Sequence, residues 1–326
     1  MNKNSKSLLI KIFGSSVILI FLISQIDWDT QKFNTVFKQL NLLWYLLSLT
    51  GVVLVLWLKS IRWNLLLKSE GCNYSFLSAF GAYMASYTIG LLTPGRIGEI
   101  ARLYYVREEK GMSVFKSFKT IVTDRIFDFA LLFWFGSAGL LFFYKAFGEF
   151  QSFIYLIISG SVLLIFWIAG TVLLKVVKSE KTLFVFVKES WTEMFDIKMV
   201  IPWILTITSY LIYYIANWMI LLALGSKISL IEVGFMLSIM SLVTLIPITL
   251  AGFGTREASM IFLFGFYSLS PESAIVFSLL QFIAFFLCGG IVGWMFWLYK
   301  PVKLSIIKDD ALKLKNWMRK FKKEDK

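Results

Sequence analysis

The chain has 326 residues, of which 58% are apolar, 17% aromatic and only 16% charged; this composition excludes both a soluble globular domain and a disordered chain and indicates a polytopic membrane protein. The net charge of +13 comes from basic residues concentrated in a few segments, so it does not indicate nucleic-acid binding, and we expect no nucleic-acid partner. The chain has no histidine and only two cysteines, which excludes His-ligated metal sites, Ser-His-Asp triads and thiolate clusters, and we expect neither a metal nor a cofactor.

Six stretches with few or no charges are long enough to cross a bilayer, which takes about 20 apolar residues. They are 8–26, 42–58, 121–144, 151–174, 200–224 and 274–299. The first resembles a signal peptide but has no small-x-small cleavage site after its apolar run, so we interpret 1–41 as an uncleaved anchor helix with an outside loop. Segment 59–68 intersperses basic and apolar residues and is interpreted as an amphipathic helix on the cytoplasmic face.

Two further stretches, 76–95 and 233–255, are uncharged, and each ends in a glycine-rich turn with charged residues. The apolar run after each turn is too short to cross alone but long enough to return to the side it came from. This pattern predicts two re-entrant helical hairpins, at 76–106 and 229–268. With the N-terminus inside and both hairpins re-entrant, the inside segments hold 25 lysines and arginines and the outside segments hold four, as the positive-inside rule requires.

This topology predicts a multi-pass protein of the cytoplasmic (inner) membrane with both termini in the cytoplasm. Residues 301–326 then form a basic tail that lies against anionic lipid. The sequence leaves the oligomeric state open, with a homodimer as one alternative.

The two halves of the chain share a spacing. The paired spacings are Gly71 to Pro94 and Gly225 to Pro247 (23 and 22 residues), and Ser113 to Asp124 and Ser270 to Gln281 (11 residues each). The first half enters the membrane from inside and the second from outside, so the chain is predicted to be an all-α polytopic membrane protein with an inverted-topology repeat, an architecture of many secondary transporters. The first repeat is 42–199 and the second is 200–300.

Three motifs resemble those of the transmembrane region of lysylphosphatidylglycerol synthases, a family of flippase-like membrane proteins. They are LTPGRIGE at 92–99 followed by Arg102, TDRIFD at 123–128, and Pro247 with GFGTRE at 252–257. The resemblance covers nearly the whole chain. It implies lipid translocation. In the bifunctional synthases this region is fused to a soluble aminoacyl-transferase domain, and we expect the synthase activity to be absent here because the chain ends about 26 residues after the last predicted helix. Gln281 stands where many relatives are expected to have a basic residue.

Eight charged residues lie in or next to the predicted membrane segments, where such residues are costly and usually face a cavity or one another. As a headgroup site we single out Arg96, Glu99, Arg102, Arg256 and Glu257 with the turn glycines Gly95, Gly98, Gly252 and Gly254. As gating or ion-pair residues we single out Asp124, Arg125, Asp128 and Gln281. Arginines and helix N-termini suit an anionic headgroup, and mutual pairing that only holds the broken helices in place is the other interpretation.

The two glutamates leave three roles open: orienting the arginines, binding a cationic part of the headgroup, or carrying a proton. Four residues apart, Asp124 and Asp128 share one helix face and are interpreted either as an inner gate or as interfacial caps.

The function favoured by these features is a flippase or scramblase for an anionic lipid, phospho- or polyprenyl-phosphate-linked, with no enzymatic activity. One alternative is a lipid-dependent glycosyltransferase in the membrane, with Asp27 and Asp29 as metal ligands. The other is an accessory subunit of a lipid-modifying enzyme, docked through the basic tail from Lys300 onward.

Overall fold

The computed structural model describes residues 30–91, 98–145, 151–176, 191–194, 196–245, 252 and 254–301. These residues form helices joined by short turns, without a strand among them. The helices are α2 (Thr30–Lys38), α3 (Leu42–Ser69), α4 (Phe76–Leu91), α5 (Ala101–Lys110), α6 (Val114–Phe143), α7 (Ser152–Val176), the 3-10 turn η2 (Ile197–Met199), α9 (Val200–Ala223), α10 (Leu230–Leu245), α11 (Thr255–Gly265), α12 (Pro271–Phe282), the π-helical η3 (Ile283–Gly289) and α13 (Gly290–Tyr299).

Five helical segments in this part of the chain are long and apolar enough to cross a membrane. They are Leu42–Ser69, Val114–Phe143, Ser152–Ala169, Ile197–Ala223 and Pro271–Tyr299. The all-α polytopic membrane fold is therefore confirmed. The sixth predicted span, 8–26, lies outside the described residues.

The interpretation of 59–68 as a separate amphipathic helix is wrong. These residues continue α3 without a break, so that the helix is 28 residues long. Arg62 and Trp63 are 0% and 1% exposed. The cation is buried because neighbouring helices supply its partners, which a pattern of charges along one helix does not reveal.

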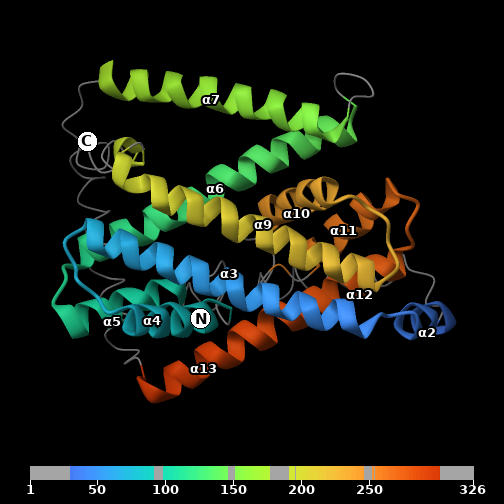
Figure 1. Ribbon diagram of the computed structural model, residues 1–326, viewed down its shortest axis with the longest axis horizontal. Helices are drawn as coiled ribbons and strands as arrows, with labels where there is room; N and C mark the ends of the chain where they lie inside the picture. The colour runs from blue at the N-terminus through green and yellow to red at the C-terminus, as the bar shows by residue number, and fades with distance from the viewer. Residues whose placement is uncertain are drawn as a thin grey trace, which may run out of the picture.

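The helices α3 to α6 of the first half recur, in order and in similar length, in the second half. The 28-residue α3 corresponds to the 24-residue α9, the 16-residue α4 to the 16-residue α10, and the 10-residue α5 to the 11-residue α11. The 30-residue α6 corresponds to the 29-residue run Pro271–Tyr299. The helices α3 and α9 lie side by side and run in opposite directions (Figure 1), as an inverted repeat requires.

The two halves also share the turn that ends their first long helix. Gly71 and Gly225 have φ angles of 81° and 76°, which glycine adopts without strain. The N–H of Gly71 bonds to the carbonyl of Lys68 at 3.0 Å, and that of the next residue to Leu67 at 2.9 Å. Gly225 and the residue after it make the equivalent bonds to Leu222 and Leu221, at 3.0 and 2.9 Å. This is the Schellman arrangement, which satisfies the last carbonyls of a helix.

In each half, the long helix that follows the short hairpin packs onto the first hairpin helix of the other half. Gly136 of α6 lies against α10, where an added Cβ would stand 2.5 Å from Leu242. At the corresponding place, Gly293 of α13 lies against α4, where a Cβ would stand 2.0 Å from the carbonyl oxygen of Met84. Close glycine contacts of this kind let helix backbones approach in a membrane. The halves are therefore interlocked.

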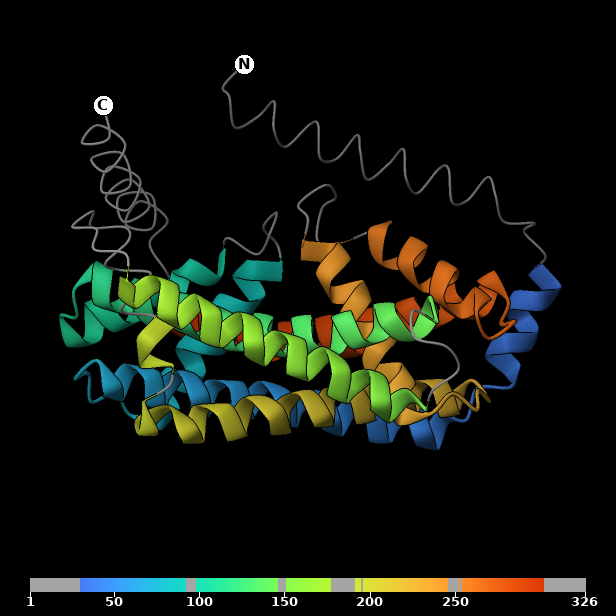
Figure 2. The same cartoon turned by 90° about the horizontal axis from the view of Figure 1, so that it is seen from above.

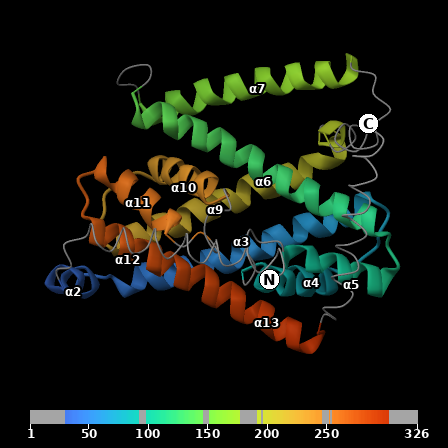
Figure 3. The ribbon, with the colours of Figure 1, turned by 180° about the vertical axis from the view of Figure 1, so that it is seen from behind.

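The two short hairpins lie toward opposite ends of the long axis of the molecule. The hairpin of α4 and α5 is at one end and that of α10 and α11 at the other, as Figures 1 and 3 both show, and Figure 2 places both on the same side of the α3–α9 pair. At 1.5 Å per residue, α4 and α10 are about 24 Å long, shorter than a hydrocarbon core of about 30 Å. Their re-entrant path stays a prediction.

Candidate functional site

Seven charged side chains from three elements gather in one ionic cluster in the first half. They are Lys59 and Arg62 of α3, Glu99 and Arg102 at the start of α5, and Asp124, Arg125 and Asp128 of α6. Asp124 is ten residues into α6, about 15 Å along a helix about 45 Å long. A hydrocarbon core of about 30 Å centred on this helix would begin about 7 Å from its end, so the cluster lies inside the predicted membrane region.

Arg62 is completely buried and binds both aspartates of α6. Its Nη2 lies 2.7 Å from Oδ1 of Asp124, and its Nη1 lies 2.9 Å from Oδ1 of Asp128. It also donates to the hydroxyl of Thr206 on α9 at 2.8 Å. The prediction that Asp124 and Asp128 share one helix face is thus confirmed, because one guanidinium reaches both. These contacts tie α3 to α6 and α9.

Arg102 fills the corresponding role on the hairpin side of the cluster. It is 1% exposed and lies 3.0 Å from Oε2 of Glu99 and 3.1 Å from Oδ2 of Asp124. Its guanidinium also stands over the ring of Tyr83, 4.7 Å from the centroid, and faces Trp63 at 5.3 Å. Cation–π contacts of this kind strengthen when water is absent. Arg102 therefore joins the hairpin to α3 and α6.

The remaining two cations lie at the edge of the cluster. The Arg125 side chain is 29% exposed and contacts Glu99 at 2.9 Å and Asp128 at 3.5 Å. Its Nε is buried and has no hydrogen-bond partner in the described part of the chain. The Lys59 side chain is 17% exposed, binds Asp128 at 3.0 Å and lies 4.6 Å from the ring centroid of Tyr210. These two side chains are the ones that an incoming group can reach.

The described residues of the ionic cluster comprise four cations and three carboxylates. An uncompensated charge in a medium of low dielectric is costly. An anion bound beside Arg125 and Lys59 would offset positive charge there, and guanidinium groups present paired N–H donors that match phosphate oxygens.

The second half carries a neutral pair where the first half has its ion pair. Gln281 is 11 residues after the helix-capping Ser270, as Asp124 is 11 residues after the helix-capping Ser113. Gln281 donates from Nε2 to Oδ1 of Asn217 on α9 at 2.8 Å. An amide thus stands in the second half where the first half has the carboxylate of Asp124.

Comparison with known proteins agrees with this architecture. The family model of the lysylphosphatidylglycerol synthase TM region matches residues 8–293. The chain belongs to that family. A UPF0104 membrane protein of Methanocaldococcus jannaschii is 24% identical over 320 residues, which cover 88% of this chain and 95% of that protein. The resemblance seen in the three motifs is thereby confirmed.

In this member of the lysylphosphatidylglycerol synthase transmembrane family, the second glycine-rich turn makes an ion pair of its own. Arg256 Nη2 lies 2.6 Å from Oε1 of Glu257, while Oε2 of Glu257 accepts the N–H of Gly254 at 2.7 Å. Gly252 and Gly254 have φ angles of 80° and 87°. Glu257 therefore caps its own helix and orients its arginine neighbour, which is one of the three roles left open.

The first glycine-rich turn is described in part. Gly95 and Arg96, with Pro94, lie outside the described residues, as does Pro247 of the second turn. The absent side chain of Gly98 leaves room for the backbone of Ile89, whose carbonyl oxygen would stand 2.4 Å from an added Cβ. Gly98 is therefore required by the packing of the turn against α4.

Sequence reasoning missed Lys59 and Arg62 as members of the site. The signal was the apolar run Leu65, Leu66 and Leu67 beyond them, which continues α3 and carries both cations into the interior. Among the described residues, no group of three or more carboxylate or thiol side chains is placed to hold a metal ion. The four cations of the cluster suit an anion instead.

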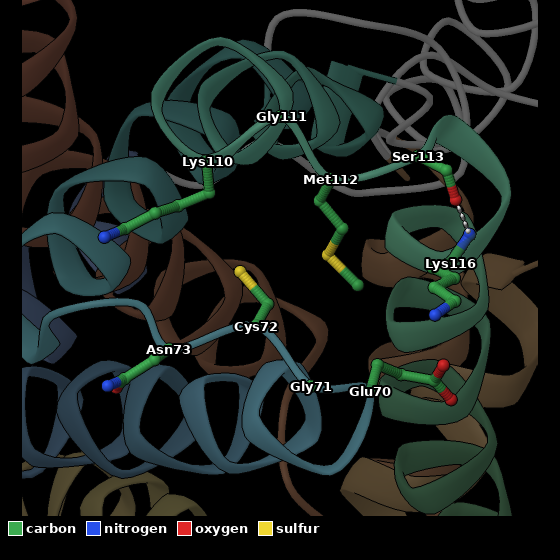
Figure 4. A pocket seen from close by; sticks show the side chains of 9 residues that line it. All are labelled: Glu70, Gly71, Cys72, Asn73, Lys110, Gly111, Met112, Ser113 and Lys116. Carbon is green, nitrogen blue, oxygen red and sulfur yellow. Dashed lines mark hydrogen bonds between the residues drawn. The ribbon is translucent and has the colours of Figure 1, made fainter.

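A separate hollow of about 500 Å³ lies between the loops at 70–73 and 110–116, which follow α3 and α5 (Figure 4). The sulfur atoms of Cys72 and Met112 point into it, and Glu70, Lys110 and Lys116 lie along its rim. Nearby, Lys119 pairs with Glu70 at 2.8 Å and also with Glu193. These contacts fasten the start of α6 to the end of α3.

Proposed function

We propose that this protein moves an anionic lipid across the cytoplasmic membrane and that the ionic cluster binds the headgroup. The observation that carries the proposal is that the described part of the cluster gathers four cations, two of them at its exposed edge, at a depth where charged side chains are rare. Membership of a family named for a lipid synthase supports a role connected with lipids.

The side chains of the cluster divide the work between holding and binding. The carboxylates fix Arg62 and Arg102, which are almost fully buried and join three helices. Arg125 and Lys59 stand at the exposed edge and bind the phosphate, while the acyl or prenyl tails stay in the bilayer. The two inverted halves rock against each other and expose the site to one leaflet and then to the other.

The test is lipid translocation by the purified full chain in liposomes. A fluorescent phosphatidylglycerol is placed in both leaflets, and dithionite then bleaches the label that reaches the outer leaflet. We expect protein-dependent bleaching of the inner-leaflet label, reduced about 10- to 100-fold in Arg125→Gln, because a charge-assisted contact is worth about 1.5–3 kcal/mol. The control Lys198→Gln removes an exposed lysine outside the cluster and should transport as wild type does.

The proposal fails if liposomes with wild-type protein bleach no further than empty liposomes, or if Arg125→Gln and Lys198→Gln are equally active. The variant Asp27→Asn with Asp29→Asn separates transport from the lipid-dependent transferase. It leaves transport unchanged under the present proposal and abolishes activity under the other.

A further inference from the structure

We infer that the second half supplies an uncharged contact for the same lipid, formed by Tyr213, Asn217 and Gln281, which binds hydroxyl groups of the headgroup. We call these three residues the hydroxyl site. The phosphate stays with Lys59 and Arg125, and the hydroxyl site takes the alcohol attached to it. The inference rests on the proposed function and names the substrate class: an anionic phosphodiester whose headgroup carries free hydroxyls, such as a glycerol or a sugar.

The first observation is a polar face on α9 that begins at the ionic cluster. Its members are Thr206, Tyr210, Tyr213 and Asn217. They are spaced by four, three and four residues and therefore share one side of the helix. Arg62 donates to the first of them at 2.8 Å, and Lys59 lies 4.6 Å from the ring centroid of the second. The exposed residues of α9 include Ile204, Ile207 and Leu211, so the apolar side faces lipid and the polar side faces the bundle.

The hydroxyl site lies at the other end of this polar face. Gln281 donates from Nε2 to Oδ1 of Asn217 at 2.8 Å and to the hydroxyl of Tyr213 at 3.3 Å. The second bond is longer than the usual length of about 2.9 Å, so a hydroxyl of a ligand can replace the amide as partner of the phenol. Tyr213 is three residues beyond Tyr210, about 4.5 Å along the helix axis, a distance that a glycerol or a sugar attached to a phosphate at Lys59 covers.

The second observation is that the repeat relates Tyr213 to Lys59. Lys59 is 12 residues before Gly71, whose turn ends α3, and Tyr213 is 12 residues before Gly225, whose turn ends α9. The amide partner of Tyr213 likewise corresponds to an aspartate of the ionic cluster. In transporters built from inverted repeats the substrate lies at the interface between the repeats. Both counterpart positions should therefore contact the same headgroup.

The chemistry of the hydroxyl site suits an alcohol. A phenol and a carboxamide each donate and accept hydrogen bonds and carry no charge. A free hydroxyl on the headgroup also donates and accepts, so it can bond to the phenol and to the amide at once. A headgroup without a hydroxyl gains nothing from these side chains. The site therefore distinguishes lipids of equal charge by their hydroxyl groups.

The experiment compares two lipids of equal charge. Tail-labelled phosphatidylglycerol and phosphatidylmethanol are both phosphodiesters with one negative charge, and only the first has hydroxyls in its headgroup. Translocation of each lipid is measured in liposomes with the purified full chain, for the wild type, Tyr213→Phe and Gln281→Leu. The matched control is Tyr214→Phe, which also removes a phenolic hydroxyl from α9, one that is bonded to Ser238 at 2.7 Å and lies outside the hydroxyl site.

We expect the wild type to move phosphatidylglycerol about three- to tenfold faster than phosphatidylmethanol, the factor that one additional hydrogen bond supplies. Tyr213→Phe and Gln281→Leu should slow phosphatidylglycerol to the rate of phosphatidylmethanol and leave the rate of phosphatidylmethanol unchanged. Tyr214→Phe should keep the wild-type ratio, although it loses the shorter hydrogen bond. If the hydroxyl site only held helices together, its variants would slow both lipids alike.

The inference is overturned if the wild type moves the two lipids at the same rate, if Tyr213→Phe keeps the preference, or if Tyr213→Phe slows both lipids by the same factor. If the wild type moves neither lipid, the proposed transport itself fails. Size-exclusion profiles and thermal unfolding show whether the variants are folded. The ratio of the two rates in the wild type tests the inference without any variant.

Discussion

The corresponding positions of the two halves allow a matched comparison of a buried ion pair with a neutral one. Asp124 and Gln281 occupy the same place in the repeat and are 0% and 5% exposed. Replacing each with leucine introduces the same side chain in both halves. The difference between the two losses in the free energy of unfolding then measures how much more the carboxylate of Asp124 contributes to stability than the amide of Gln281.

The contacts set the expected magnitudes. In the wild type, the carboxylate of Asp124 lies 2.7 Å from Arg62 and 3.1 Å from Arg102. Asp124→Leu removes this carboxylate from two buried guanidinium groups, and loss of one partner of a buried ion pair costs about 3–5 kcal/mol. Gln281→Leu removes a 2.8 Å bond to Asn217 and a longer one to Tyr213, which costs about 1–2 kcal/mol. The expected difference is about 2 kcal/mol, a factor of about 30 in the unfolding equilibrium.

The assay is equilibrium unfolding in mixed micelles, titrated with a denaturing detergent and followed by circular dichroism. The double variant Arg62→Met with Asp124→Leu should lose less than the sum of the two single variants, because Arg62→Met removes one of the cations that Asp124→Leu deprives of a partner. Equal losses for Asp124→Leu and Gln281→Leu would refute this reasoning, as would strict additivity in the double variant.

Two further predictions concern packing and thiol chemistry. Gly293→Ala should lower the unfolding free energy by about 1–3 kcal/mol, because the added Cβ would stand 2.0 Å from the carbonyl oxygen of Met84. The control Gly265→Ala should cause no loss in the same titration, because a Cβ added there has no neighbouring atom within 4 Å. Equal effects of the two substitutions would contradict the close packing of α13 on α4. Burial raises the pKa of the Cys72 thiol, and the thiolate is the reactive form. In a Cys288→Ser background, alkylation of Cys72, followed by mass spectrometry, should therefore be slower at pH 7.5 than alkylation of a free thiol and should accelerate as the pH rises above 9. A rate of alkylation that does not change with pH would contradict this.

The membrane fold could be predicted from the sequence because it depends on local properties. Length and hydropathy along each stretch predict the spans, although two of the helices begin earlier than the predicted stretches, at Val114 and Pro271. The position of Asp124 and Asp128 on one face of a helix followed from helix geometry alone. The interlocking of α13 with α4 was beyond reach, because residues such as Gly293 and Met84 are brought together by the packing of the whole chain.

The site was predicted only in part, because the type of a residue is visible in the sequence but its partners on other helices are not. The carboxylates on α6 and Glu99 were identified from their type and their depth in the sequence. Arg62 was not, because a cation between apolar residues has the same pattern whether its partner is water or a carboxylate on another helix. What distinguishes the two is the set of neighbours, here Asp124, Asp128 and Thr206 from α6 and α9.

The two halves share their packing but not their charge, and this difference has a consequence for the proposed transport. The helix lengths, the turns at Gly71 and Gly225 and the close contacts at Gly136 and Gly293 correspond, so packing contributes similarly to the two states of a rocking motion. The ionic cluster contributes to one half only, since Gln281 and Asn217 are neutral. Under the proposed transport, one state hydrates the cations of this cluster and the other buries them, so a bound anion should change the preference of the protein between the two states. Neutralising Lys59 should therefore shift the balance between the two states without any ligand, and distances measured between spin labels on α4 and α10 would show the shift.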